Sequence, residues 1–323
     1  MLSIGLISKW HVHANGYAKE LKNDPRVQIT SVWDEDPERG AAWAQELDAS
    51  FIADYDEFLA SDIQAVVCDS ATTQHERLLT KAAQAGKHIF TEKLLAPTTK
   101  EAEAIAEAVR KAGVTFTISL PCKGSPQVLY AKQLIDEGKL GRVTGARFRR
   151  SHGGVSGGWL PGYWFKVEDS GGGALMDLGA HPVYVLGGLF GVPKRVTALM
   201  TELFGTGSDE NTIALAEFEG GILGTMETAF VTGGVPDLLE VYGTKGAVYV
   251  RGGEVVQNIG NGMEAVPPEA LPAGKPGPLS QFIQACLDGV AEPEGLGLED
   301  GLLMTRITEA AYASEKSGKT VMM

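Results

Sequence analysis

The chain has 323 residues, 44% of them hydrophobic, which is enough for two domains that each bury a core. A net charge of −13 at pH 7, with no basic cluster to neutralise phosphates, argues against a nucleic-acid partner. The first ten residues do not resemble a signal peptide, and no apolar run reaches the roughly 18 to 20 residues that span a bilayer. We therefore expect a soluble, cytoplasmic protein without a membrane partner.

Residues 1–120 alternate between short apolar segments and helix-like segments. The expected strands are Leu2–Ile7, Val27–Trp33, Ala65–Cys68, His88–Thr91 and Val114–Ser119. The expected helices between them are Asn15–Lys22, Pro37–Leu47, His75–Ala85 and Lys100–Lys111. This rhythm predicts a parallel sheet covered by helices on both faces, and the doubly wound dinucleotide-binding fold is the first candidate.

Residues 121–323 have a different pattern, which predicts a second domain of the α+β class. A helix is expected at Val128–Glu137, and further helices at Leu279–Leu287 and Glu299–Glu315. Between them lie expected strands at Val143–Arg150, Arg195–Phe204, Thr212–Phe218, Leu223–Phe230, Leu238–Tyr242 and Ala247–Arg251. Several of these strands alternate apolar and polar residues, which favours a large, mainly antiparallel sheet with one open face.

The turn after the first expected strand lacks the glycines typical of a dinucleotide site. In the motif G-x-G-x-x-G, the glycines allow a tight turn and a close approach of the backbone to the pyrophosphate. If Ser8 takes the first position, Trp10 and His13 take the other two. Asp34 ends the second strand, where a carboxylate accepts hydrogen bonds from the adenine ribose and repels a 2′-phosphate. Asp34 therefore favours NAD over NADP, unless it only forms the turn at the strand end.

His11 and His13 support a competing hypothesis. Metal-dependent hydrolases on (β/α)₈ barrels carry His-x-His after a first strand, and His152, Asp177 and His181 would supply further zinc ligands. After residue 140, however, the chain does not keep the strand–helix rhythm of a barrel. Three distant cysteines without a CxxC pair, Cys68, Cys122 and Cys286, also argue against a disulfide framework or a thiolate zinc site. The leading hypothesis assigns no metal.

Two segments carry residues suited to moving a proton. Glu92 and Lys93 follow the strand His88–Thr91, at the edge where doubly wound sheets bind ligands. A lysine there can stabilise charge on a substrate oxygen, although a surface lysine is the usual alternative.

The second segment, Gly171–Pro182, reads GGGALMDLGAHP. We expect a flexible triple glycine to lead into a helix on which Asp177 and His181, four residues apart, share a face. Histidine is suited to accept the proton of an alcohol near neutral pH. The alternatives are a structural pair at a helix start and, because of Pro182, a kink or a late start of the helix.

These residues resemble the Gfo/Idh/MocA family of oxidoreductases. Ala65–Lys93 is similar to the family's strand–TPxxxH–helix–GKHxxxEKP segment, with Ser70–His75 at the TPxxxH place. Gly171–His181 matches its GGGxLxDxGxH motif. Later landmarks match at Gly138–Val143, Val241–Gly246 and Glu299–Ser314, so the resemblance covers nearly the whole chain.

The resemblance implies a Rossmann-type domain followed by an open-faced sheet domain, assembled as a homodimer or homotetramer. It implies hydride transfer between NAD or NADP and a sugar, polyol or inositol-like substrate, with Lys93, Asp177 and His181 as catalytic residues. The residues expected to bind cofactor are Ser8, Trp10, His11, Val12, Asp34, Ser70, Thr72, His75, Glu92 and Lys93. Those expected to bind substrate are Lys93, Lys123, His152, Trp164, Asp177 and His181.

The sequence also departs from the family pattern. Leu94 and Ala71 replace two prolines, Lys123 is the one cation in Pro121–Lys123, and Tyr184 stands where an acid is frequent. Together with the missing glycines, these changes leave open a non-catalytic member of the same fold that binds a nucleotide or a sugar. The retained Lys93, Asp177 and His181 oppose that alternative.

Overall fold

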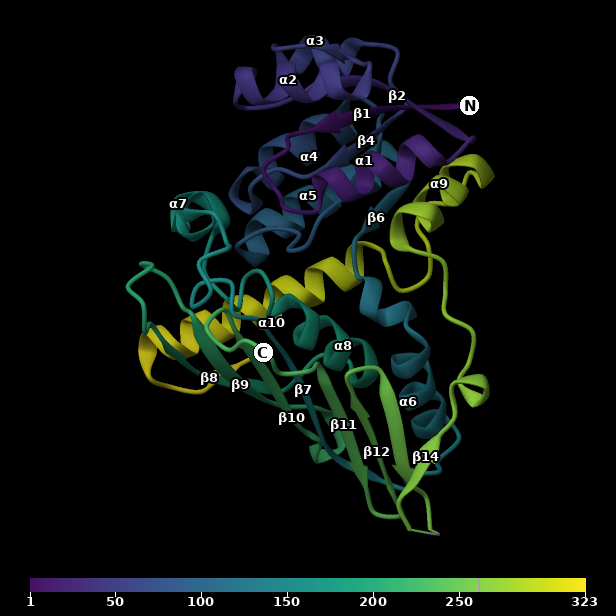
Figure 1. The fold of residues 1–323 in the computed structure, drawn as a ribbon, viewed down its shortest axis with the longest axis vertical. Helices are drawn as coiled ribbons and strands as arrows, with labels where there is room; N and C mark the ends of the chain where they lie inside the picture. Colours follow the sequence, from purple (N-terminus) through teal and green to yellow (C-terminus); the bar gives the residue numbers. More distant parts are fainter. Residues whose placement is uncertain (261) are drawn as a thin grey trace. The chain divides into compact units, whose positions relative to one another are not determined.

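The computed structural model describes residues 1–260 and 262–323, which form two compact units (Figure 1). The first unit comprises Met1–Ser119 and Gly277–Leu302. The second comprises Leu120–Pro276 and Leu303–Met323.

The first unit contains a six-stranded parallel sheet with the order β3-β2-β1-β4-β5-β6. Its strands are β1 (Leu2–Ile7), β2 (Val27–Trp33), β3 (Ser50–Phe51), β4 (Ala65–Cys68), β5 (His88–Thr91) and β6 (Phe116–Ile118). Its helices include α1 (Ala14–Asn23), α2 (Pro37–Leu47), α3 (Tyr55–Ala60), α4 (His75–Gln84) and α5 (Thr99–Ala112). The strand order reverses between β1 and β4, so the predicted doubly wound sheet is confirmed, with its ligand-binding switch point at these two strands.

Local sequence signals explain where the helices of this unit begin and end. Asp36 caps α2 by accepting hydrogen bonds from the N–H groups of Glu38 and Arg39, and Pro37 occupies the first helical position. Thr98 and Glu101 form a capping box at the start of α5. These caps satisfy N–H groups that the first turn of a helix leaves without a helical partner.

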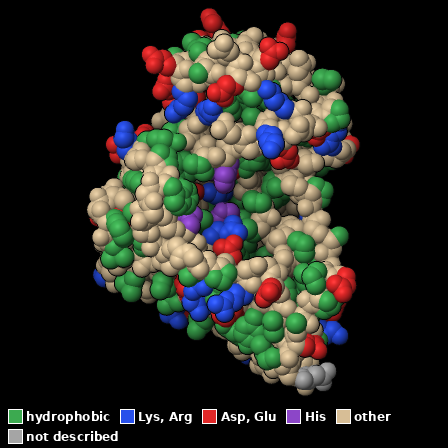
Figure 2. Space-filling view, in the orientation of Figure 1, with side chains coloured by type: hydrophobic (Ala, Val, Ile, Leu, Met, Phe, Trp, Pro, Cys, Tyr) green, Lys and Arg blue, Asp and Glu red, His purple; other side chains and the backbone are tan. Residues whose placement is uncertain are grey.

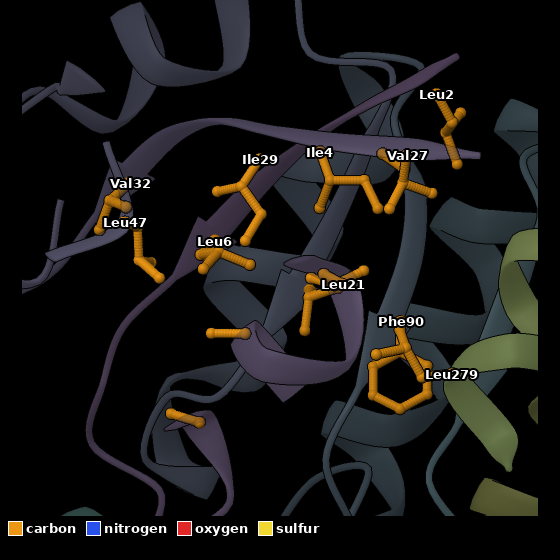
Figure 3. Packing of buried hydrophobic residues seen from close by; sticks show 14 of the residues in the cluster. Leu2, Ile4, Leu6, Leu21, Val27, Ile29, Val32, Leu47, Phe90 and Leu279 are labelled. Carbon is orange, nitrogen blue, oxygen red and sulfur yellow. The ribbon is translucent and has the colours of Figure 1, made fainter. Parts of the chain in front are cut away.

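The core of the first unit includes a helix from late in the chain. Figure 3 shows Leu2, Ile4 and Leu6 of β1 in one cluster with Phe90 of β5 and Leu279. Leu279, together with the buried Phe282 and Ile283, lies on α9 (Pro278–Asp288). The sequence predicts two consecutive domains that divide at residue 120. In the structure, the first unit also includes Gly277–Leu302. The amphipathic pattern of α9 shows that it buries one face, but not which core receives that face.

The second unit contains a nine-stranded sheet with the order β14-β13-β12-β11-β7-β10-β9-β8-β15. Its strands are β7 (Val143–Ser151), β8 (Arg195–Thr201), β9 (Asn211–Glu217), β10 (Leu223–Ala229), β11 (Leu238–Gly243), β12 (Ala247–Arg251), β13 (Glu254–Asn258), β14 (Glu264–Val266) and β15 (Val321–Met322). All neighbouring pairs are antiparallel except β7 and β10. The predicted large, mainly antiparallel sheet is confirmed.

The second unit also contains helices. They are α6 (Pro126–Asp136), α7 (Val167–Ser170), α8 (Ala180–Phe190) and the later part of α10 (Leu298–Ser317). Helix α8 packs against β7 and β10. Along β9, Thr212, Ala214 and Ala216 are buried, while Ile213 and Leu215 between them are exposed. The alternation leaves an open face, as the sequence pattern predicts.

No helix formed by the described residues is both long and apolar enough to pass through a lipid bilayer. On the face of the first unit that Figure 2 shows, acidic and basic side chains are interspersed among the described residues.

Candidate active site

The turn after β1, where the sequence predicts phosphate binding, keeps part of the backbone form of a glycine loop. Ser8 has a φ of 67°, in the left-handed region that glycine adopts readily. The Ser8 hydroxyl accepts a hydrogen bond from the N–H of Trp10 at 3.1 Å, and this bond stabilises the turn locally. Helix α1 begins soon afterwards, at Ala14, so its N-terminus follows this turn, an arrangement that pyrophosphate sites use. The turn therefore fits a dinucleotide in its backbone, although Trp10 and His13 replace glycines.

Asp34, the predicted ribose ligand, is already engaged by protein groups. Its carboxylate has no exposed surface and accepts hydrogen bonds from the N–H groups of Lys9 at 2.8 Å and Asp36 at 2.9 Å. It also pairs with the Arg39 guanidinium at 2.6 Å. Asp34 thus joins the turn after β1 to the start of α2, and its contact with a ribose remains a prediction.

Glu92 is the centre of a buried polar cluster at the carboxyl edge of β5. Its side chain accepts hydrogen bonds from the N–H of Lys93 at 3.0 Å and from the Tyr17 hydroxyl, and it pairs with Nδ1 of His13 at 2.9 Å. Burial by itself raises the pKa of Glu92, but the positive charges of His11, His13 and Lys93 and the hydrogen bond from His13 hold it well below its ordinary value. Glu92 is therefore an anion beside Lys93, which is also buried.

His75 joins two loops of the first unit. Its Nδ1 lies 2.9 Å from the carbonyl oxygen of Leu94, and its Nε2 lies 3.3 Å from that of Ser70. The ring is completely buried, and burial lowers its pKa. Nearby Thr72 is buried at the start of a 3₁₀ turn, and the Lys93–Leu94 peptide bond is cis. His75 thus holds the loops after β4 and β5 together, whether or not it also contacts a cofactor.

In the second unit, His181 lies in a hydrogen-bonded group. Its Nδ1 is 2.7 Å from the hydroxyl of Tyr184 and 3.5 Å from Sγ of Cys122. The Tyr184 oxygen also accepts the N–H of Cys122 at 3.1 Å. A guanidinium nitrogen of Arg150 lies 3.2 Å from the Cys122 sulfur. Burial and the neighbouring Cys122 raise the pKa of Tyr184 well above its ordinary value, so its phenol stays protonated beside the imidazole.

The expectation that Asp177 and His181 share one helical face is wrong. Helix α8 begins at Ala180, so Asp177 lies in the preceding turn, where its Oδ2 accepts a hydrogen bond from Nε1 of Trp164 at 3.2 Å. Pro182 explains the late start, since proline is tolerated in the first turn of a helix and not in its interior.

The triple glycine is tightly packed, which contradicts its expected flexibility. The N–H groups of Gly173 and Leu175 donate to the Asp209 carboxylate at 2.9 and 2.8 Å, and the Tyr312 hydroxyl donates to it at 2.7 Å. A Cβ on Gly173 would lie 2.0 Å from the carbonyl oxygen of Asp209, and one on Gly172 would clash with Tyr312. The glycines therefore permit a close approach of backbones, and this approach fixes the turn that carries Asp177.

Further predicted substrate residues lie on the same unit. The His152 ring stacks on Phe230 with a centroid distance of 5.1 Å and lies 4.7 Å from the ring of Trp159, which is 59% exposed. The aliphatic part of Lys123 packs closely against Gly188 of α8. A Cβ added to Gly188 would lie 3.1 Å from Cε of Lys123. These residues provide aromatic and cationic groups, which are suited to the C–H faces and hydroxyls of sugars.

Sequence reasoning missed several residues of these clusters. The sequence patterns assign no role to Tyr17, Asp69 or Asp209, and they mark Tyr184 and the Pro121–Lys123 stretch that contains Cys122 only as departures from the family motifs. The partners Tyr17 and Glu92 are 75 residues apart, and Gly173 and Asp209 are 36 apart, so no local spacing links them. Tyr184, three residues after His181, is the one that helical spacing could have found.

Comparison with known proteins gives a family for both parts of the chain. Residues 5–120 match the model of the Gfo/Idh/MocA oxidoreductase family with its NAD-binding Rossmann fold, and residues 128–249 match the Gfo/Idh/MocA C-terminal domain. The (β/α)₈ hydrolase hypothesis is wrong, because β1 belongs to an open six-stranded sheet. The resemblance found in the sequence is confirmed.

The relatives include enzymes acting on carbohydrates. The chain is 25% identical to the 1,5-anhydro-D-fructose reductase of Ensifer adhaerens over 229 residues, 69% of this chain and 68% of that protein. It is 35% identical to the D-xylose dehydrogenase of Paenarthrobacter nicotinovorans over 152 residues, 43% of this chain and 39% of that protein. The crystal structure of GenD2 from gentamicin A biosynthesis in complex with NAD is 27% identical, with a TM-score of 0.85 over 100% of this chain and 96% of that chain. The chain thus belongs to the Gfo/Idh/MocA family of NAD-binding oxidoreductases, with NAD as its cofactor.

Proposed function

We propose that the protein is a dehydrogenase that transfers hydride between NAD and a carbon of a sugar, polyol or inositol-like substrate. The observation that carries this proposal is the group formed by His181, Tyr184 and Cys122, in which a buried imidazole is held by a phenol in a chain of an NAD-binding family. Bound NAD supplies the acceptor for the hydride.

His181 acts as the acid and base. When the substrate carbon gives up hydride, its hydroxyl proton passes to Nε2 of His181. For Nε2 to accept that proton, Nδ1 has to carry the other ring proton and donate it in the hydrogen bond with Tyr184, 2.7 Å away. Tyr184 is thus a positioning residue that selects the tautomer of His181.

Lys93 and Asp177 each contribute to the same reaction. The Lys93 ammonium stabilises negative charge that develops on the reacting oxygen. Asp177, held by Trp164, orients a substrate hydroxyl by accepting its hydrogen bond. Lys123, His152 and Trp164 complete the proposed substrate contacts.

The proposed cofactor contacts come from the carboxyl edge of the parallel sheet. Ser8, Trp10, His11 and Val12 supply the phosphate turn after β1, and Asp34 supplies the ribose contact after β2. The other proposed residues follow β4 and β5, and they are Ser70, Thr72, His75, Glu92 and Lys93. This distribution agrees with the rule that doubly wound sheets bind ligands at the carboxyl ends of their strands.

We also propose that two copies of the chain pair through the open face of the nine-stranded sheet, as a homodimer or within a homotetramer. Leu199, Ile213, Leu215 and Leu223 are 75%, 47%, 52% and 62% exposed. The strand register places these side chains on one face, because Leu199 pairs with Ile213 and Leu223 pairs with Glu217. An apolar patch of this kind favours a protein partner.

The function is tested by titrating NADH and NADPH into the protein and then assaying a panel of sugars and polyols. We expect NADH to bind, and at least one substrate to be turned over by the wild type. His181→Ala should bind NADH but lose turnover by about 10² to 10⁴-fold. Lys93→Ala, which also removes a proposed cofactor contact, should lose turnover to at least the same degree. Full turnover by His181→Ala would refute the assigned base. NADH binding without turnover of any substrate would favour the non-catalytic alternative.

A further inference from the structure

Three potential metal ligands meet at the carboxyl edge of the parallel sheet. His11 and His13 lie in the turn after β1, and Glu92 follows β5. One nitrogen from each imidazole and one carboxylate oxygen all lie within 4.8 Å of one another. His11 and Glu92 are buried, whereas the His13 side chain is half exposed, so the group is closed on one side and accessible on the other.

These donors match the ligand set of zinc. Imidazole nitrogen and carboxylate oxygen both bind Zn²⁺ at about 2.0 to 2.2 Å, and two histidines with one glutamate leave one position for a small ligand. Nδ1 of His13 and Oε1 of Glu92 are 2.9 Å apart, a distance at which they share a proton. A metal ion would take the place of that proton, because imidazole ligands bind metals in their deprotonated form.

Asp69 provides a second, independent observation. It is 1% exposed, and neither of its carboxylate oxygens accepts a hydrogen bond from any group in residues 1–260 or 262–323. A buried carboxylate without donors is costly unless a positive charge compensates for it. The Asp69 carbonyl accepts the N–H of His11 at 2.9 Å, so this residue is anchored directly beside the cluster.

Further groups hold Glu92 in place. The Tyr17 hydroxyl and the N–H of Lys93 both donate to its carboxylate. Outer hydrogen bonds of this type orient metal ligands and contribute to metal affinity.

We propose that His11, His13 and Glu92, with Asp69 beside them, bind a divalent transition-metal ion of the Zn²⁺ class. We further infer that the metal and NADH exclude each other. This exclusion rests on the proposed function, in which His11 and Glu92 also contact the cofactor. His11 and His13 stand where a glycine loop would otherwise receive the pyrophosphate, so a metal would block the switch point of the sheet.

The first experiment measures metal binding without nucleotide. The full chain is treated with a chelator and dialysed, and Zn²⁺ is then titrated by calorimetry. In parallel, the visible absorption of added Co²⁺ reports whether the ion has entered a low-symmetry protein site. We expect a single ion per chain, and an affinity at least about 100-fold lower in His13→Ala and Glu92→Gln, since even outer-shell changes cost about 10 to 100-fold. His152→Ala is the matched control, because it removes an imidazole outside the cluster and should bind like the wild type.

Circular dichroism identifies variants that fail to fold, and the half-exposed His13 keeps the test usable if Glu92→Gln is unstable. Absence of Zn²⁺ binding by the folded wild type, or equal affinity in folded His13→Ala, would overturn the metal site. In the second experiment, Zn²⁺ is titrated in the presence of saturating NADH, and a lower apparent Zn²⁺ affinity is expected. Unchanged affinity with NADH bound would overturn the exclusion alone. Failure of NADH to bind metal-free protein would instead contradict the proposed cofactor site.

Discussion

The hydroxyl of Tyr184 lies one helical turn from His181 and 2.7 Å from its Nδ1, and it also accepts the N–H of Cys122. Tyr184→Phe removes this contact and retains the ring. We expect kcat to fall roughly tenfold, a part of the 10² to 10⁴-fold that acid–base catalysis contributes. The pH profile of kcat should shift as well, because the tautomer of His181 is no longer selected. Unchanged kcat and pH profile would show that Tyr184 has only a packing role.

Asp69→Asn should stabilise the metal-free protein at neutral pH. Burial and the charge of Glu92 raise the pKa of Asp69 well above 3.8 in the folded state, whereas the unfolded chain releases the same proton near 3.8. The folded state therefore binds more protons, and stability falls as pH rises from about 3.8 toward the folded pKa. The side chain of the Asp69→Asn variant does not release a proton, so the variant does not lose stability in this way.

We expect the free energy of unfolding of Asp69→Asn at pH 7 to rise by an amount on the order of 1 kcal/mol or more, as measured by urea denaturation. The gain should shrink below about pH 3.8, where the carboxyl is protonated in both states. Asp62→Asn, at an exposed carboxyl, is the control. An equal effect of both variants would contradict the assignment.

Gly173→Ala should destabilise the second unit. The added Cβ would lie 2.0 Å from the Asp209 carbonyl oxygen, so backbone has to move. We expect a loss of about 1 to 3 kcal/mol or more, measured as a lower midpoint of thermal or urea denaturation. Gly16→Ala in α1 is the matched control, since nothing lies within 4 Å of the added carbon and alanine favours a helix by about 0.5 to 1 kcal/mol. If Gly173→Ala has the same denaturation midpoint as the wild type, the backbones of residues 173 and 209 can move apart without a loss of stability.

Asp34→Asn should change cofactor preference. If the carboxylate accepts ribose hydroxyls, its loss should weaken NADH binding about tenfold, the value of a hydrogen bond to a charged group. NADPH binding should weaken less or improve, because the charge that repels a 2′-phosphate is gone. Fluorescence titration of both nucleotides measures the ratio, with Glu35→Gln as the neighbouring control. An unchanged ratio would leave Asp34 as a partner of Arg39 alone.

Leu215→Glu tests the proposed pairing of sheets. A charge in the centre of the exposed apolar face should shift a dimer or tetramer toward smaller species, as measured by light scattering after gel filtration. Circular dichroism should remain unchanged, because Leu215 is half exposed in the single chain. If the mass of wild type and variant is the same, the pairing does not use this face.

The sequence was sufficient to predict elements whose pattern is local. Strands such as Val27–Trp33 and helices such as Pro37–Leu47 were predicted with their observed bounds, because alternation, proline and capping residues act within a few positions. Strand β3 has two residues and α3 has six, too few for periodicity to indicate them. The late start of α8, at Ala180, follows from the sequence only as an alternative suggested by Pro182, because the turn before the helix depends on Asp209, which is far along the chain.

The candidate site was predictable only in its separate residues. The resemblance identified Lys93, Asp177 and His181, and their catalytic roles remain predictions. The clusters around Glu92 and His181 could not be predicted, since Tyr17 and Cys122 reach them from distant segments. Contacts between segments that are far apart in the sequence leave no regular spacing from which they could be predicted.

The placement of α9 in the core of the first unit has a consequence for biosynthesis. When residues 1–119 leave the ribosome, Leu2, Phe90 and their neighbours lack the apolar face that Leu279 and Phe282 later provide. Part of the apolar interior of the nascent first unit therefore stays exposed until more than 150 further residues have been translated. An exposed interior of this kind is a target for chaperones and a source of aggregation. Premature termination before Gly277 would thus release both an incomplete sheet unit and a first unit that cannot finish folding.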